Sequence, residues 1–312
     1  MQILTTPEDA AAGLADYPFT SHRVPVPSGD GGTLRVHYVD EGPADARPVV
    51  FLHGNPSWSY IWRHPIAAVT EAGFRAVALD LVGMGLSDKP TELADYTVAR
   101  HVAWTGAALF EQLDLRDTIL VLHDWGAIIG LRLLAEHPER VAGVVVSNTG
   151  FPERDPDEPL PETIEASGPF ADFQRMARKA PRWEPWTLLP MVMATPISDE
   201  VTAGYRAPYP DASLTIGSRA FTQLLPTRPN NPMLPDNFRA WKVLEKFDRP
   251  FLTLFSDKDM VAPNGWKPLV ARVPGAKGQP HQILEGGGHF LQEDIPEAYS
   301  AALVSWLRGS GF

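Results

Sequence analysis

The chain has 312 residues, of which 44% are hydrophobic and 21% charged, a composition that excludes a disordered protein and allows one large domain or a domain with an insertion. Its 27 basic and 38 acidic residues give a net charge of −11, which argues against nucleic acid or an anionic membrane as a partner. Because the chain has no cysteine, disulfides, a thiolate nucleophile and cysteine-bound metal centres are excluded.

Short β-branched runs alternate with helix-length patterns along most of the chain. Several runs are apolar at every position, as expected of strands covered on both faces. This alternation predicts the α/β class, with a mostly parallel sheet and helices on both faces. The predicted strands are Leu34 to Val39, Pro48 to Leu52, Arg75 to Leu81, Thr118 to Leu122, Val141 to Ser147, Phe251 to Phe255 and Gln282 to Leu284. The predicted helices are about Ser59 to Ala72, Val98 to Leu113, Trp125 to Glu136 and Ile295 to Leu307.

The middle of the chain is rich in proline. Between Pro152 and Pro235 lie 15 of the 31 prolines, so this segment differs in character from both flanks. We interpret it as an insertion. The expected division is a main domain of residues 1–152 and 230–312 and an inserted domain of residues 153–229.

The N-terminal residues 1–9 contain no basic stretch followed by an apolar one. No segment approaches the roughly 18 apolar residues of a membrane-spanning helix. We therefore expect a cytoplasmic protein with no membrane partner. A monomer is the default expectation, because nothing in the sequence indicates an interface.

Polar residues follow several predicted strands, where ligands of parallel sheets bind. His53-Gly54-Asn55-Pro56 follows one strand and, taken alone, is more often a plain strand-to-helix turn. Asp124 stands between a strand and a helix, where aspartate commonly caps the helix. Ser256-Asp257-Lys258-Asp259 and Gly286-Gly287-Gly288-His289 follow the last two strands, and a histidine after three glycines is hard to explain by core packing.

The chain order Asp124, Asp259, His289 resembles the α/β-hydrolase superfamily, in which nucleophile, acid and histidine follow in this order and the nucleophile lies on a strained strand-to-helix turn. The usual turn has small residues two positions before and after the nucleophile, whereas this chain has Leu122 and Gly126. This departure argues against a serine esterase. An aspartate nucleophile narrows the resemblance to haloalkane dehalogenases, haloacetate dehalogenases and epoxide hydrolases, which form an alkyl-enzyme ester.

Trp125 and Asn55 distinguish among these families. Haloacetate dehalogenases carry an arginine directly after the nucleophile, and epoxide hydrolases an aromatic residue after the His-Gly pair. Trp125 and Asn55 at these positions are similar to haloalkane dehalogenases, and the resemblance runs essentially from end to end. It includes Tyr17-Pro18-Phe19, His37-Tyr38-Val39-Asp40-Glu41-Gly42, Trp58-Ser59-Tyr60, Gly85-Leu86-Ser87-Asp88-Lys89-Pro90, Ala207-Pro208-Tyr209-Pro210-Asp211 and His289-Phe290-Leu291-Gln292-Glu293.

The resemblance implies hydrolysis of haloalkanes to a primary alcohol and halide through a covalent alkyl-aspartate ester, with no metal or organic cofactor. Asp124 would displace the halide, held by the Trp125 indole N–H and the Asn55 amide. His289, oriented by Asp259, would then activate water. Backbone N–H groups of Asn55 and Trp125 would stabilise the oxyanion. The implied partners are a small apolar halogenated substrate, water and a halide ion.

Two assignments have competitors. Asp257 could take the role of Asp259, but the family pattern aligns with Asp259. Some dehalogenases carry the acid after the preceding strand, where this chain has Asn148, which cannot supply a negative charge.

In one subfamily a cap tryptophan holds the halide and glutamate follows the His-Gly pair. This chain has Asn55 there and Phe173 at the aligned cap position, so it combines features of two subfamilies. Trp183 and Trp186 lie nearby and are interpreted as packing.

The resemblance also implies that residues 153–229 form a mostly helical cap that closes the pocket and excludes water. Candidates for the pocket wall are Phe170, Phe173, Phe221 and Val261, each of which could equally belong to the core. One alternative function is an epoxide hydrolase, with Tyr205 and Tyr209 as ring-oxygen donors. Another is a non-catalytic ligand receptor on the same scaffold, since fold alone does not fix function.

Overall fold

The computed structural model describes residues 1–312, apart from the side chain of Pro169. An eight-stranded sheet in the order β10-β9-β8-β7-β4-β5-β3-β2 forms its centre. All neighbours from β5 to β10 in this order pair in parallel, while β3 pairs antiparallel with both β2 and β5. This confirms the mostly parallel sheet. The strands are β2 (His22–Pro27), β3 (Thr33–Glu41), β4 (Pro48–Leu52), β5 (Arg75–Leu79), β7 (Thr118–His123), β8 (Val141–Ser147), β9 (Phe251–Ser256) and β10 (Gln282–Leu284), with a small separate pair β1 (Ile3–Leu4) and β6 (Lys89–Pro90).

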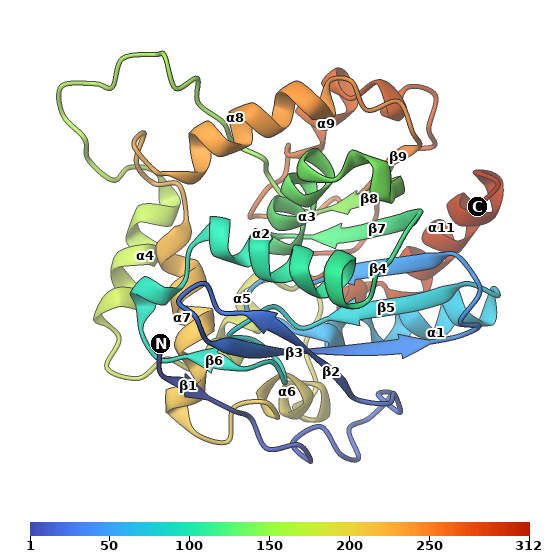
Figure 1. The fold of residues 1–312 in the computed structure, drawn as a ribbon, viewed down its shortest axis with the longest axis horizontal. Coiled ribbons are helices and arrows are strands. Elements are labelled where there is room, and N and C mark those ends of the chain that lie inside the picture. The colour runs from blue at the N-terminus through green and yellow to red at the C-terminus, as the bar shows by residue number, and fades with distance from the viewer.

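Helices cover both faces of the sheet, as Figure 1 shows. Every residue of β4 is buried, with Val50 and Leu52 in one core cluster and Val49 and Phe51 in the other, because successive strand residues point to opposite faces. One face is covered by α2 (Val98–Gly106), α3 (Trp125–Glu136), α8 (Met233–Leu244) and α9 (Trp266–Arg272), and the other by α1 (Arg63–Glu71), the short α10 (Leu291–Asp294) and α11 (Pro296–Gly309).

Strand β2 was not among the predicted elements. Its sequence carries Pro25 and Pro27, which lack the N–H that a ladder needs and so weaken any strand prediction. In the structure β2 is an edge strand, paired only with β3 within the sheet. An edge position is where a strand tolerates proline, because its outer side has no partner to bond.

Between β8 and α8 the chain forms four α-helices: α4 (Pro169–Lys179), α5 (Leu189–Val192), α6 (Asp199–Arg206) and α7 (Ile216–Leu224). The arrowheads of β7 and β8 point toward the side of the molecule where α4 and α7 lie (Figure 1). The Gln174 side chain of α4 donates to the backbone oxygens of Thr222 and Gln223 of α7, 3.3 and 3.0 Å away. The inserted helices thus stand over the carboxyl ends of the strands.

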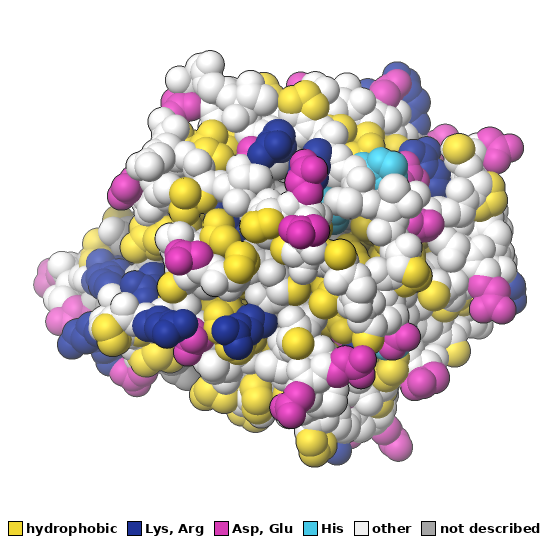
Figure 2. Space-filling model, turned by 90° about the horizontal axis from the view of Figure 1, so that it is seen from below, with side chains coloured by type: hydrophobic (Ala, Val, Ile, Leu, Met, Phe, Trp, Pro, Cys, Tyr) yellow, Lys and Arg dark blue, Asp and Glu magenta, His cyan; other side chains and the backbone are white. Residues whose placement is uncertain are grey.

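Charge is unevenly distributed on the surface. Figure 2 shows acidic side chains spread over the face seen from below, with most of its basic side chains gathered toward the side where α4 lies in Figure 1. Helix α4 itself ends in Arg178 and Lys179. Among the helices that the structure describes, none has the length and apolar character needed to cross a membrane.

Candidate active site

Asp124 occupies a strained turn between β7 and α3. Its φ of 50° and ψ of −124° lie outside the regions that most residues adopt, and its side chain makes no capping hydrogen bond to α3. Instead, Asp124 Oδ1 accepts a hydrogen bond from the backbone N–H of Asn55 at 2.8 Å. Asp124 is therefore held by the turn after β4 and does not serve as a side-chain cap of the helix.

Two glycines make room for this turn. A Cβ on Gly54 would lie 2.1 Å from Asp124 Oδ1, and a Cβ on Gly126 would lie 2.1 Å from the backbone oxygen of Leu52. Both distances are far below a tolerable contact, so any larger residue would push β4 and the Asp124 turn apart. The small residue two positions after Asp124 thus has a direct steric cause.

His289 connects Asp124 to Asp259. Its Nε2 lies 3.5 Å from Asp124 Oδ2, and its Nδ1 donates to Asp259 Oδ1 at 3.0 Å. Asp259 also accepts the backbone N–H groups of Val261 and Ala262, at 2.9 and 3.2 Å, which fix the direction of its carboxylate. The three residues predicted from their order in the chain thus converge at one edge of the sheet.

The two competing positions for the acid have other partners. Asp257 Oδ1 accepts the backbone N–H of Gly286 at 2.8 Å. The Asn148 side-chain amide donates to the backbone oxygens of Gly288 and His289, at 2.9 and 3.0 Å. Asn148 therefore holds the backbone of the histidine loop, while the imidazole itself is paired with Asp259.

Burial and charge act in opposite directions on the ionisable groups. Burial alone lowers the pKa of His289, but hydrogen bonds to Asp124 and Asp259 and the charges of both carboxylates outweigh it and raise this pKa to about 9. Burial raises the pKa values of Asp124 and Asp259, but the hydrogen bond to His289 and its charge leave both below the ordinary value. At neutral pH the free site therefore holds an imidazolium between two carboxylates.

A cavity of about 450 Å³ adjoins Asp124 and His289 and is mostly apolar. Phe170, Phe173 and Val261, predicted for the pocket wall, all line it. Phe221 does not; it is fully buried, with its ring 5.3 Å from that of Trp125 and 4.4 Å from that of His101. The complete wall is Asn55, Pro56, Asp124, Trp125, Phe170, Phe173, Leu188, Met191, Val192, Thr222, Leu225, Met260, Val261, His289 and Phe290.

Two polar side chains that line this cavity have no protein partner. Neither the Trp125 indole N–H nor the Asn55 side-chain amide makes a hydrogen bond to any residue that the structure describes, and Asn55 Oδ1, an acceptor, is buried without a partner. An anion would therefore be bound by the NH₂ group of this amide and not by its oxygen. Unpaired donors in an apolar wall are costly unless a ligand accepts from them. The pair is therefore suited to hold an anion beside Asp124.

The other cap aromatics considered as donors are engaged elsewhere. Trp183 Nε1 donates to Ser218 Oγ at 3.1 Å, and Trp183 is absent from the cavity wall. The Tyr205 hydroxyl donates to Glu293 at 2.6 Å, and the Tyr209 hydroxyl lies 3.9 Å from the sulfur of Met84. The Trp186 ring stacks on Tyr209 with centroids 6.3 Å apart. None of these side chains is among the residues that line the cavity.

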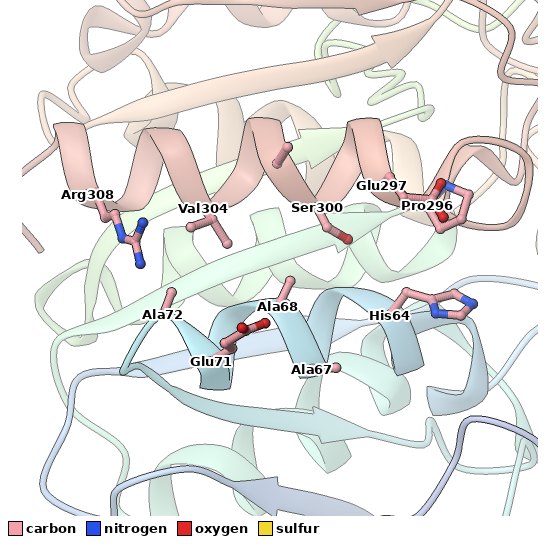
Figure 3. Close-up of a pocket in the computed structure, with 11 residues that line it drawn as sticks. His64, Ala67, Ala68, Glu71, Ala72, Pro296, Glu297, Ser300, Val304 and Arg308 are labelled. Carbon is pink, nitrogen blue, oxygen red and sulfur yellow. The ribbon is translucent and has the colours of Figure 1, made fainter.

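Of the other cavities, one adjoins this site and another lies far from it. One of about 500 Å³ shares Asp124, Trp125, Phe170, Leu225 and Val261 with the first and extends toward residues 263–268. Another, of about 590 Å³, lies between α1 and α11, as Figure 3 shows, and its wall contains no residue of the predicted site. Among the described residues, no group of three His, Asp or Glu side chains is placed to hold a metal ion.

Several wall residues escaped the sequence analysis. Leu188, Met191 and Val192 come from the turn before α5 and from α5 itself, and Met191 and Met260 are 63% and 74% exposed. Nothing in their local sequence separates them from other apolar cap residues. Which side of a short helix faces a cavity depends on contacts with distant parts of the chain.

Known proteins match this chain over its full length. A family model described as alpha/beta hydrolase fold matches residues 47–193. The chain is 41% identical over 309 residues to a haloalkane dehalogenase of Mycolicibacterium paratuberculosis and 43% identical over 308 residues to one of Psychrobacter cryohalolentis, and each match covers 99% of both proteins. Among solved structures, the tetrameric haloalkane dehalogenase DpaA from Paraglaciecola agarilytica NO2 superposes with a TM-score of 0.83 at 27% identity, over 99% of this chain and 98% of that chain. The haloalkane dehalogenase DatA from Agrobacterium tumefaciens C58 has a TM-score of 0.76 at 27% identity, over 97% of this chain and 100% of that chain.

Proposed function

Because this chain belongs to the haloalkane dehalogenase family and is a hydrolase of carbon–halogen bonds, we propose that Asp124, His289 and Asp259 perform this reaction through a covalent alkyl-aspartate ester. One observation carries the proposal. A carboxylate on a strained turn lies 3.5 Å from an imidazole and borders an apolar cavity with two unpaired donors in its wall. A haloalkane needs an apolar pocket for its alkyl chain, and polar groups only beside the departing halide.

In the first half-reaction, an Asp124 oxygen attacks the carbon that bears the halogen, and the halide leaves with the electron pair of the broken bond. The backbone N–H of Asn55 fixes Oδ1 at 2.8 Å, which leaves Oδ2 as the attacking atom. The indole N–H of Trp125 and the amide of Asn55 receive the halide. Both residues line the cavity beside Asp124, so their donors lie close to the place where charge develops on the halogen.

In the second half-reaction, His289 takes a proton from water, and the resulting hydroxide attacks the carboxyl carbon of the ester. Formation of the ester neutralises Asp124, so one of the two carboxylates that raise the pKa of His289 is removed. The imidazolium can then release its proton and act as a base. Asp259 stabilises the imidazolium that forms again when water is deprotonated. The tetrahedral intermediate then collapses: the bond between the carboxyl carbon and the alkyl oxygen breaks, and the departing alkoxide takes the proton from the His289 imidazolium. The products are a primary alcohol, a halide ion and one proton.

The Asn55 N–H would stabilise the oxyanion, since it already holds Oδ1. The Trp125 backbone N–H remains the proposed second donor. Residues 153–229 would act as the cap, because Phe170 and Phe173 of α4, Val192 of α5 and Thr222 of α7 all contribute to the cavity wall. Exclusion of water by such a cap strengthens the interactions at the departing halide.

We propose that the enzyme works as a cytoplasmic monomer, because residues of a single chain complete the cavity beside Asp124. A cysteine-free chain is compatible with that compartment. One related structure is described as tetrameric. Light scattering on a size-exclusion column distinguishes the two states, and a mass of 34.3 kDa is expected for a monomer.

The proposal is tested by release of halide and protons from 1,2-dibromoethane, 1-bromobutane and 1-iodohexane, with styrene oxide as the competing substrate. Wild-type protein should release both ions in equal amounts. Asp124→Asn should abolish release, and His289→Phe should allow one halide per active site at most. Diol formation from styrene oxide with no halide from any haloalkane would instead support an epoxide hydrolase, although Tyr205 and Tyr209 are engaged away from the cavity.

A further inference from the structure

The loop that carries His289 is in direct backbone contact with the inserted helices. The N–H of His289 donates to the backbone oxygen of Val192, at the end of α5, at 2.8 Å. A Cβ on Gly288 would lie 2.6 Å from that oxygen and 2.7 Å from the nitrogen of Ala194. The two backbones are therefore packed so closely that only glycine fits before His289.

One carboxylate connects the two segments. Asp294 Oδ2 accepts the N–H of Gly288 at 2.8 Å and the N–H of Ala194 at 2.9 Å. Its Oδ1 accepts the N–H of Thr195 at 2.8 Å and the Thr195 hydroxyl at 2.5 Å. Two of the N–H groups belong to the chain just after α5, and the third belongs to the residue before His289.

The peptide on the other side of His289 is held independently. The backbone oxygen of His289 accepts from His123 Nε2 at 2.8 Å and from the Asn148 amide at 3.0 Å. Without Asp294, the loop would keep these anchors and the bonds from Asn148 and Ser256 Oγ to the backbone oxygen of Gly288, at 2.9 and 2.7 Å, but the Gly288 N–H would lose its side-chain partner. The expected result is a displaced peptide between Gly287 and Gly288 and a weaker tie to the α5 segment, which together shift the His289 imidazole relative to Asp124 and to the attacking water.

We infer that Asp294 is a positioning residue for His289 that also ties the histidine loop to the α5 segment of the cap. This inference rests on the proposed function, because it assumes that His289 activates water. The carboxylate cannot reach the substrate side directly, since Asp294 is not part of the cavity wall. Its effect on catalysis must therefore pass through His289 and Val192.

The inference predicts a selective effect on one half-reaction. Displacement of halide needs Asp124, Trp125 and Asn55, none of which bonds to Asp294. Hydrolysis needs His289 and water in line with the ester, and a misplacement of about 1 Å can cost on the order of 100-fold in rate. Asp294→Ala should slow hydrolysis of the ester by about 10- to 100-fold and change the displacement rate by less than about 2-fold.

The experiment is rapid-quench single turnover with 1,2-dibromoethane, followed by mass spectrometry of the protein. Asp294→Ala should accumulate the alkyl-enzyme, and Asp294→Asn, which keeps one acceptor oxygen, should accumulate less. Thr195→Val is the matched control: it removes one hydroxyl but leaves the carboxylate and its three N–H partners. Tyr205→Phe removes a neighbouring cap contact, from the Tyr205 hydroxyl to Glu293, but keeps the ring that packs against Phe290. Both controls should hydrolyse the ester at the wild-type rate.

The outcomes separate the two proposals. If His289→Phe forms no alkyl-enzyme, the proposed function fails. If it forms the ester but Asp294→Ala hydrolyses it as fast as wild type, or if both half-reactions slow equally in Asp294→Ala, the inference alone is overturned. Should Asp294→Ala not fold, Asp294→Asn decides by the same comparison, performed below its melting temperature.

Discussion

Leu122, two residues before Asp124, fills the space that Gly130 leaves in helix α3. A Cβ on Gly130 would lie 2.4 Å from Leu122 Cδ2 and 2.8 Å from Cδ1. The usual small residue at position 122 is therefore replaced by a pair, in which a large residue two positions before the proposed nucleophile is accommodated by a glycine in the following helix. The strained turn at Asp124 is kept although its sequence pattern is incomplete.

This pair gives a stability prediction. In an exposed helix, alanine is favoured over glycine by about 1 kcal/mol. Here Gly130→Ala should instead destabilise the fold by roughly 1–3 kcal/mol, because the added methyl group overpacks against Leu122. Urea denaturation measures the change in the free energy of unfolding.

The control is the same substitution in a Leu122→Ala background. There the methyl group has space, so Gly130→Ala should be neutral or should stabilise by up to about 1 kcal/mol. Equal destabilisation in both backgrounds would show that the cost arises elsewhere in α3.

The strands were predicted well where burial acts on every residue. Pro48–Leu52, Val141–Ser147 and Gln282–Leu284 have the predicted bounds, and the first two are almost entirely buried. Strand β2 was missed because its prolines are tolerated only through its edge position, which depends on the whole sheet. Whether a strand lies at the edge of the sheet cannot be predicted from its local sequence.

The residues of the candidate site could also be predicted only in part from the sequence. Asp124 and His289 follow strands of a parallel sheet, so the rule that such ends converge was enough to predict their meeting. The wall residues Leu188 and Met191 could not be found, because the orientation of α5 depends on contacts such as that between His289 and Val192. Phe221 was a reasonable candidate for the cavity wall by residue type, but its ring packs against those of His101 and Trp125.

The proposed halide donors can be ranked by mutation. Asn55→Ala should slow halide displacement by about 10²- to 10³-fold, the usual effect of losing one oriented donor. Trp183→Phe should leave the step unchanged, because the Trp183 N–H is bonded to Ser218 and lies outside the cavity wall. Single-turnover kinetics with 1-bromobutane give both rates. The opposite ranking would remove Asn55 from the halide site.

The acid can be tested without changing its size. Asp259→Asn should slow ester hydrolysis by roughly 10³- to 10⁴-fold, because the imidazolium loses the charge that stabilises it. The first displacement should continue, so one halide per active site is released before turnover stops. Asp257→Asn is the matched control and should turn over normally, since its partner is the Gly286 N–H. Steady-state turnover by Asp259→Asn at the wild-type rate would reject the assignment.

The ion pair at the site should make stability depend on pH. The folded pKa of His289 is raised from 6.5 to about 9, so the protonated imidazole stabilises the fold fully below pH 6.5, and this contribution is lost as pH rises through about 9. The pKa values of Asp124 and Asp259 are lowered from 3.8, so their contribution is lost only in acid and does not change in this window. The contribution of His289 to the wild-type melting temperature should therefore fall between pH 6.5 and 9, while the lowered pKa of Lys89 makes a separate contribution that rises with pH above about 7. In Asp124→Asn one carboxylate beside His289 is gone, so the folded pKa of His289 is less raised; the fall still starts near pH 6.5 but should be smaller and end at lower pH. Other groups that titrate here, such as the buried Lys89 with its pKa lowered to about 7, are common to both proteins and cancel in the comparison.

Scanning fluorimetry of both proteins from pH 5 to 10 measures the difference, and superimposable curves would mean that Asp124 does not hold the His289 proton.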